Sequence, residues 1–177
     1  MKGQAAPQTA RAGTQRSATS KTGILSARWF LFGAPLWGAV MALSVYAGLQ
    51  ISIGGLTSHM TALLALYFAG GTLAFPIALV IIGFLTRKRR AEARFSIAFI
   101  CLGGLTVAVT AGLFAIIYRS FYAQWHGEFA TVLWAYQLAF TLASALYQFA
   151  VIGVRNFMPL GLVFLVAASY RLAKTTR

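Results

Sequence analysis

The chain has 177 residues, of which 59% are hydrophobic and only 10% are charged. Soluble domains carry charge on about a quarter of their residues, so this composition excludes an ordinary water-soluble protein. Fifteen Lys and Arg stand against two acidic residues, Glu92 and Glu128, for a net charge of +13. The basic residues flank apolar stretches, and the basic tail lacks the interleaved aromatic side chains that stack on bases, so we expect a membrane protein that does not bind nucleic acid.

The first 24 residues are rich in Ala, Thr, Ser, Gln and Gly and contain no acidic residue. Such a composition offers little to bury and predicts a disordered basic tail over residues 1–24. We expect this tail to lie in the cytoplasm. An organelle transit peptide is the alternative, because such peptides are also basic and poor in acids.

Residues 25–177 are predicted to form one transmembrane domain with four apolar spans. Each span is longer than the about 20 residues that cross the hydrocarbon core as a helix. No alternation of polar and apolar residues suggests barrel strands, so helices remain. We therefore predict an all-α integral membrane protein, a four-helix transmembrane bundle made of two hairpins. The expected spans are residues 29–51, 61–85, 96–118 and 130–153.

The basic residues predict the orientation of these spans, because cytoplasmic loops carry an excess of Lys and Arg. The connection at residues 86–95 is the most basic and should be cytoplasmic, like the tail, where it can also attract anionic lipid headgroups. The connections around His59 and from Arg119 to Glu128 carry little charge and should face outward. We expect a bacterial inner membrane, with an organelle membrane as the alternative. The cytoplasmic connection contains Arg87, Lys88, Arg89, Arg90 and Arg94.

The C-terminal region contains a shorter apolar segment, residues 157–170, which is about 21 Å long as a helix and shorter than the ~30 Å core. Gly153 suits a helix end and Pro159 a helix start, so we predict a break between them. The segment can be re-entrant or interfacial, a short fifth span, or part of a shifted fourth span at 147–170. The last option places Arg155 in the bilayer at a cost of about 2.5–3.5 kcal/mol or more. We expect a short C-terminal hydrophobic helix docked on the bundle, with Arg155 at the cytoplasmic end of the fourth span.

A shift of the chain by 66 or 67 residues aligns several features of the two predicted hairpins. Such a parallel repeat would be one of the symmetries found in transporter folds, and the few identities leave it open whether the repeat is real. The matched pairs are Gly38 with Gly104, Ala42 with Ala108, His59 with His126, and Lys88 with Arg155.

Small residues recur at every fourth position in three spans, and in lipid such stripes are typical of helix–helix contact faces. They are Ala34, Gly38 and Ala42; Gly104, Ala108 and Gly112; and Ala135, Ala139 and Ala143. A polar stripe also follows one face of the fourth span. It predicts hydrogen bonds between helices, with a polar path or a docking face for another subunit as the alternative. The stripe consists of Gln137, Thr141, Ser144, Gln148 and Arg155.

The outward connections hold the few groups capable of metal binding or acid–base chemistry. His59, His126 and Glu128 are the candidate metal ligands, and with Arg119 and Trp125 they could lie close together. Their spacing matches no zinc signature, so we interpret them as solvated loop residues and expect no metal or cofactor. A pH-sensitive or substrate-contacting outer mouth is the alternative.

The sequence contains no acidic residue within a predicted span and no nucleotide-binding, hydrolase or metalloprotease motif. Enzymatic activity is therefore not expected. We predict a non-catalytic accessory, assembly or anchoring subunit of a larger membrane complex. The alternative is a small oligomeric transporter, flippase or channel for a polar or anionic substrate. The expected partners are anionic lipids and other membrane-protein subunits or further copies of the chain.

Overall fold

The computed structural model describes residues 29–53, 59–122 and 127–175, and these residues form helices and short turns without a β-strand. By length and composition, four helical segments are able to cross a membrane. They are Trp29–Ile51, Met60–Leu85, Ala91–Phe121 and Val132–Phe157. The structure thus confirms the predicted all-α, multi-pass membrane fold. The predicted tail, residues 1–24, lies outside the described part of the chain.

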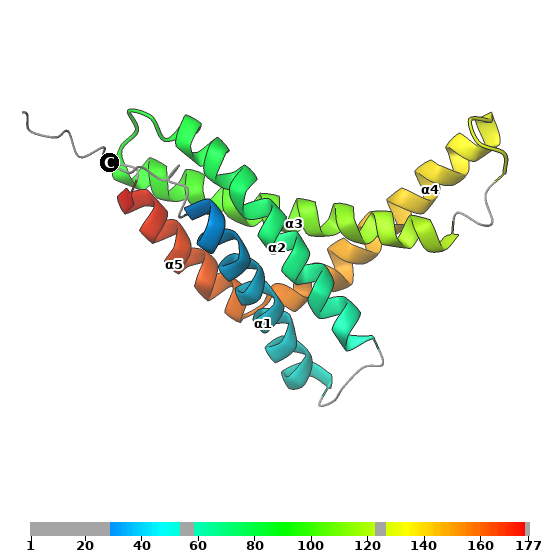
Figure 1. Cartoon of the computed structure of the whole chain (residues 1–177), viewed down its shortest axis with the longest axis horizontal. Coiled ribbons are helices and arrows are strands. Elements are labelled where there is room, and N and C mark those ends of the chain that lie inside the picture. The colour runs from blue at the N-terminus through cyan, green and yellow to red at the C-terminus, as the bar shows by residue number, and fades with distance from the viewer. Residues whose placement is uncertain (1–28, 54–58, 123–126, 176–177) are drawn as a thin grey trace, which may run out of the picture.

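Figure 1 shows the order and arrangement of the helices. A π-helical turn, η1 (Trp29–Gly33), leads into α1 (Ala34–Ile53), followed by α2 (Met60–Leu85) and α3 (Ala91–Tyr122). Next come α4 (Val132–Gln148), the π-helical η3 (Phe149–Gly153), the 3₁₀-helical η4 (Val154–Phe157) and α5 (Leu160–Thr175). The third helix is longer than predicted, so Arg94 lies within α3 and not in the connection before it.

Two adjacent glycines on α2 allow α1 and α3 to approach it from two sides. A Cβ atom on Gly71 would lie 3.0 Å from the Cα of Gly38 on α1, and a Cβ on Gly38 would lie 2.5 Å from the carbonyl oxygen of Phe68. On the other side, a Cβ on Gly70 would lie 3.0 Å from the Cα of Thr110 on α3. In lipid, helices associate through such close packing, so these glycines bring α1, α2 and α3 together.

The shorter helix α5 completes the packed core. It lies against α1 and α3, where Gly161 is next to Ser44 and Gly103 is next to Leu165. Leu172 on α5 is buried in the same core as residues of the first three helices. Large side chains that are almost fully enclosed there include Met41, Val45, Tyr67, Leu79, Ile82, Leu102 and Leu172. The prediction of a docked C-terminal helix agrees with this arrangement.

The helical path does not end at Gly153, which was the predicted helix end. Gly153 is the last residue of η3, and the chain continues through η4 to Phe157 before the backbone becomes extended at Met158. Pro159 then directly precedes α5, as its preference for helix starts suggests.

The second hairpin differs from the first. In Figure 1, α4 diverges from α1 and α2, and its contacts are chiefly with α3. Ala145 is the buried residue of α4. The two hairpins also differ at positions that the 66-residue shift matches, because Gly38 is buried whereas Gly104 and Ala108 are exposed. The packed unit therefore consists of α1, α2, α3 and α5, with α4 as an arm beside it.

Candidate functional site

Three residues of the predicted polar stripe form hydrogen bonds within the α3–α4 hairpin. The Gln137 side chain accepts a 2.8 Å bond from the backbone N–H of Gly127, and Thr141 donates a 2.7 Å bond to the Gln137 carbonyl. Gln148 Nε2 donates a 3.3 Å bond to the hydroxyl of Tyr118 on α3. Of these bonds, only that of Gln148 joins two helices, as the stripe predicts; the other two are local to α4 and the turn before it.

The remaining two members of the stripe are exposed. Ser144 lies on the outer surface of α4, one residue before the buried Ala145. Arg155 lies in η4, where it lines a cavity of about 160 Å³ together with Gly48 and Met158. The stripe is thus not a continuous lining, because its members point to different surroundings.

The position of Arg155 corrects its predicted place at the same end as the basic connection. Gly48, its neighbour across the small cavity, lies in the last two turns of α1. Because α1 ends where α2 begins, this half of the bundle lies away from the turn between α2 and α3 that contains Arg87. The chain returns to the basic end only along α5, so Lys88 and Arg155 are not equivalent in space.

A buried tyrosine holds the turn between α4 and α5 against α2. The Tyr67 hydroxyl donates a 2.7 Å hydrogen bond to the Gly153 carbonyl and accepts one of 3.3 Å from Asn156 Nδ2. The Tyr67 ring also contacts Phe157 edge-on, with ring centroids 4.9 Å apart. Polar groups within a bilayer need such partners, and these bonds position the turn.

The small residues of α4 form an uncovered face. Ala135, Ala139 and Ala143 are all exposed, and we call them the α4 small-residue face. By contrast, Ala34 and Gly38 on α1 are buried, as predicted for a contact face. The α1 stripe is therefore a contact face within the chain, whereas the α4 stripe is not covered by the described residues, and its role as a contact face stays a prediction.

The candidate metal ligands are not brought together where the structure describes them. His59 directly precedes α2 and is exposed, whereas Glu128 lies in the turn before α4. The starts of these two helices lie well apart in Figure 1. His126 and Trp125 lie outside the described residues. Among residues 29–53, 59–122 and 127–175, no group of three His, Cys, Asp or Glu could hold a metal ion.

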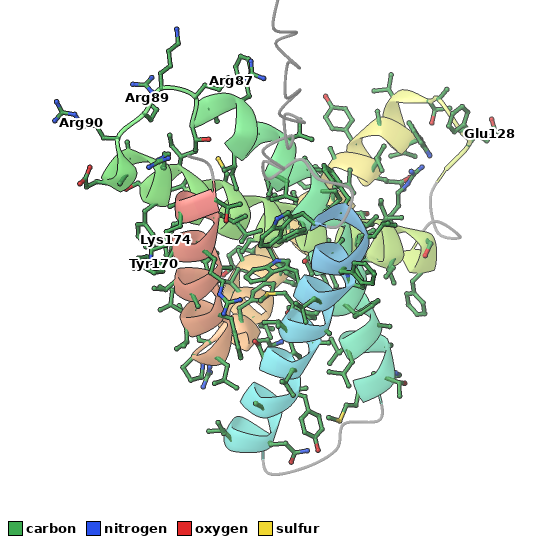
Figure 2. All side chains as sticks on the ribbon, turned by 60° about the vertical axis from the view of Figure 1, so that its left-hand side comes forward. Arg87, Arg89, Arg90, Glu128, Tyr170 and Lys174 are labelled. Carbon is green, nitrogen blue, oxygen red and sulfur yellow. The ribbon has the colours of Figure 1, made fainter. Side chains whose placement is uncertain are left out.

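One end of the molecule is strongly basic. Arg87, Arg89 and Arg90 project from the turn between α2 and α3, and Lys174 on the last turn of α5 lies at the same end (Figure 2). The chain thus gathers cations from two segments that are far apart in sequence. We call this region the basic end; it consists of Arg87, Lys88, Arg89, Arg90, Arg94, Arg171 and Lys174.

Two cations of the basic end have distinctive surroundings. Lys174 Nζ lies 4.5 Å from the ring centroid of Tyr170, and its hydrogen bond and charge lower the pKa of that phenol. Arg94 is only partly exposed, and its Nε atom is buried without a hydrogen-bond partner. A buried donor of this kind is costly unless it finds an acceptor.

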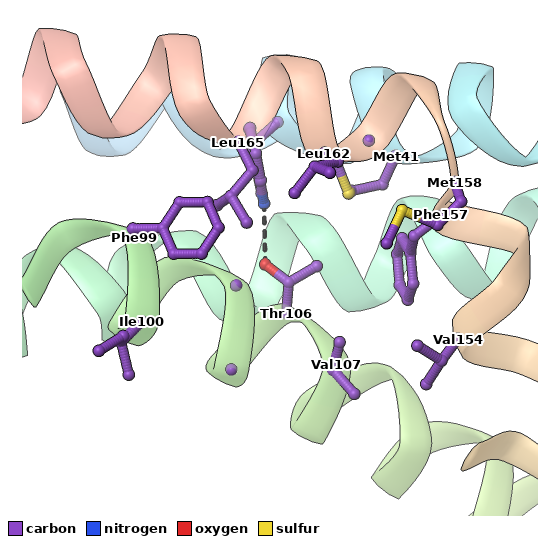
Figure 3. A pocket seen from close by; sticks show the side chains of 14 residues that line it. Met41, Phe99, Ile100, Thr106, Val107, Val154, Phe157, Met158, Leu162 and Leu165 are labelled. Carbon is purple, nitrogen blue, oxygen red and sulfur yellow. Dashed lines mark hydrogen bonds between the residues drawn. The ribbon is translucent and has the colours of Figure 1, made fainter. Parts of the chain in front are cut away.

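An apolar cavity of about 380 Å³ lies between α1, α3, α5 and the turn that precedes α5. Its lining includes Met41 from α1, Phe99 and Val107 from α3, and Leu162 and Leu165 from α5 (Figure 3). Sequence analysis did not reveal this cavity, because its lining comes from three helices and no single one carries a distinctive pattern. The glycines Gly103, Gly104 and Gly161 in its lining were the one available signal.

The cavity contains one pair of polar side chains. Trp37 Nε1 donates a 3.0 Å hydrogen bond to Thr106 Oγ1, which in turn donates a 2.6 Å bond to the Leu102 carbonyl. The polar side-chain atoms of the lining therefore satisfy one another. The cavity is suited to a molecule or segment that needs no hydrogen bonds.

Comparison of the chain with protein-family models, curated proteins and solved structures finds no match.

Proposed function

We propose that the protein is a non-catalytic accessory subunit that joins a larger membrane assembly through α4. The observation that carries this proposal is the position of α4 outside the packed unit, with Ala145 as its buried residue. In lipid, apolar side chains gain little from leaving the hydrocarbon, so close packing and hydrogen bonds decide which helices associate. An arm with a small-residue face is well suited to close packing against another helix.

The polar residues of α4 support the same proposal. Ser144 is exposed on this helix, and so is Gln148, whose side chain already bonds to Tyr118; polar side chains at bilayer depth favour a protein partner over lipid. Each hydrogen bond between helices contributes only about 0.6 kcal/mol on average, so several contacts must act together. The partner expected for α4 is thus another membrane helix with small or polar residues.

The alternative function, transport of a polar or anionic substrate, has less support. Three members of the proposed polar path form bonds within the α3–α4 hairpin, and the 380 Å³ cavity is apolar. A path for a polar substrate would need groups that replace its water.

The proposed location is the inner membrane of a bacterium, with the basic end in the cytoplasm. The gathering of the basic residues of the α2–α3 turn and of α5 at one end supports this orientation, because cytoplasmic segments are enriched in Lys and Arg. Both the N-terminus and the C-terminus would then be cytoplasmic.

Crosslinking in native membranes tests the proposed function. A photoreactive amino acid replaces Ala139 on the α4 small-residue face or, as the matched control, Ala167 on the exposed surface of α5. We expect a defined protein adduct from position 139 and not from position 167. We also expect Ala139→Leu, but not Ala167→Leu, to release the partner during purification in mild detergent. A lone monomer in detergent, with no protein adduct from position 139, would contradict the proposal.

A further inference from the structure

The cavity between α1, α3 and α5 opens onto the outer surface of the bundle. Ile100 and Gly104 on α3 and Leu162 on α5 line the cavity and are also exposed. Because α3 is long and apolar enough to cross the membrane, the cavity opens toward hydrocarbon. The molecules available at its opening are therefore lipid acyl chains.

The size of the cavity suits one acyl chain. An apolar cavity of about 150 Å³ can accommodate benzene. The cavity has a volume of about 380 Å³. Scaled from the six carbon atoms of benzene, this volume has room for an acyl-chain segment of roughly 15 carbon atoms. Left empty, the cavity would cost its lining the dispersion contacts that close packing provides. An acyl chain restores these contacts and makes no demand for hydrogen bonds.

The cavity lies close to the basic end along two helices. Arg94 precedes the lining residue Phe99 by five positions on α3, and Arg171 follows the lining residue Leu165 by six positions on α5. These separations correspond to about 7.5 Å and 9 Å along a helix axis. Neither arginine lines the cavity, and each lies about 120–140° around its helix from the lining residue, so the headgroup would extend past the opening of the cavity to reach the basic end.

Arg94 supplies a second observation that points to an anion. Its Nε atom is buried and has no hydrogen-bond partner among the described residues. A guanidinium group binds phosphate through two parallel hydrogen bonds, and Nε is one of its donors. Because Nε itself is enclosed, a lipid phosphate would meet the exposed part of the Arg94 side chain.

We propose that the cavity binds one acyl chain of an anionic phospholipid whose phosphate is held by Arg94 and Arg171. The bound lipid completes the packing between α3 and α5 and connects the apolar cavity to the basic end. This inference does not depend on the proposed role of α4.

The chain offers a matched pair of variants for testing the cavity. A Cβ atom at Gly104 or at Gly112 would meet nothing within 4 Å, so both helical glycines have room for a side chain. Gly104 lines the cavity, whereas Gly112 does not. Gly104→Leu should therefore obstruct the cavity, and Gly112→Leu is the control for the same change on the same helix.

The experiment uses full-length protein in vesicles that contain phosphatidylglycerol with a photoreactive diazirine in its acyl chain. After illumination, labelled peptides are mapped by mass spectrometry. We expect labelling around Phe99 and Leu165 to exceed labelling around Val80, a lipid-exposed position on α2. Gly104→Leu should lower labelling of the cavity about fivefold, equivalent to about 1 kcal/mol of binding free energy. Gly112→Leu should leave it unchanged.

The headgroup is tested with phosphatidylcholine that carries the same photoreactive chain. We expect weaker labelling of the cavity by this zwitterionic lipid than by phosphatidylglycerol, and loss of the difference in Arg94→Gln/Arg171→Gln. Wild-type labelling that is no stronger in the cavity than at Val80 would indicate general lipid contact and overturn the proposal, whether or not any variant folds. Equal labelling by both lipids would refute the proposed phosphate site.

Discussion

The hydroxyl of Tyr67 donates a 2.7 Å hydrogen bond to the carbonyl oxygen of Gly153, 86 positions further along the chain. Tyr67 lies two turns after the start of α2, and Gly153 ends the π-helical turn that follows α4. This bond joins the α1–α2 hairpin to the turn from which α5 starts. It therefore helps to set the point at which the chain turns back toward the basic end.

We predict that Tyr67→Phe lowers the free energy of unfolding by about 1–2 kcal/mol, because the Gly153 carbonyl loses a buried donor while the ring still packs. Hydrogen exchange in the η3 and η4 segments should rise, as measured by mass spectrometry in detergent micelles. Tyr136→Phe, on an exposed position of α4, is the control and should change neither quantity. Unchanged exchange in Tyr67→Phe would show that packing alone positions the turn.

Gly38→Ala is predicted to separate α1 from α2. The added Cβ would lie 2.5 Å from the Phe68 carbonyl oxygen, a backbone atom that cannot move without moving α2. Overpacking of this kind costs about 1–3 kcal/mol. Gly112→Ala has open space for its Cβ and should be neutral or stabilising by up to about 1 kcal/mol through helix propensity. Reversible unfolding in mixed micelles measures the stability of both variants. Equal stability of Gly38→Ala and Gly112→Ala would contradict the close approach of α1 to α2.

Thr106→Val should cost about 1–3 kcal/mol, because it leaves the buried indole N–H of Trp37 without its acceptor. The double variant Trp37→Phe/Thr106→Val removes both partners and should be less destabilised than the sum of the two single variants. Unfolding free energies of the four proteins form a complete cycle. Additive losses would mean that the bond contributes nothing to stability.

The orientation of the chain predicts which positions an impermeant thiol reagent can reach. In a Cys101→Ala background, Arg89→Cys and Lys174→Cys should be protected in intact cells and labelled after lysis, since both lie at the basic end. His59→Cys, before α2, should be labelled in intact cells because α2 is able to cross the membrane. Labelling of Arg89→Cys from outside would place the basic end outside the cell. Opposite accessibility of positions 89 and 174 would instead contradict their place at one end.

The bounds of the apolar spans were predictable from the sequence to within a few residues, except where polar residues extend a helix. Hydrocarbon excludes an unpaired backbone, so a sufficiently long apolar run must form a helix. This requirement for a helix within the hydrocarbon does not make the helix end at the last apolar residue. Arg94 was accordingly predicted in a connection, although it lies in the first turn of α3.

The packing partners of the small-residue stripes were not predictable. Gly38 and Gly104 occupy similar local patterns, yet Gly38 meets α2 closely while Gly104 has nothing within 4 Å of a Cβ position. Local spacing defines a face of a helix but not the helix that covers it. For the same reason the two connections alone could not show whether His59 and Glu128 lie close together.

By itself, the sequence determined that the chain forms membrane-crossing helices and that basic residues flank them, because both properties follow from local composition and the cost of polar groups in lipid. Only the tertiary structure decided that α5 and not α4 completes the packed unit and that Arg155 lies away from the basic end. It also created the cavity from three separate helices. These features depend on close approach at particular residues, such as Gly38, Gly71 and Tyr67, because helices in lipid are selected by fit and not by hydrophobicity.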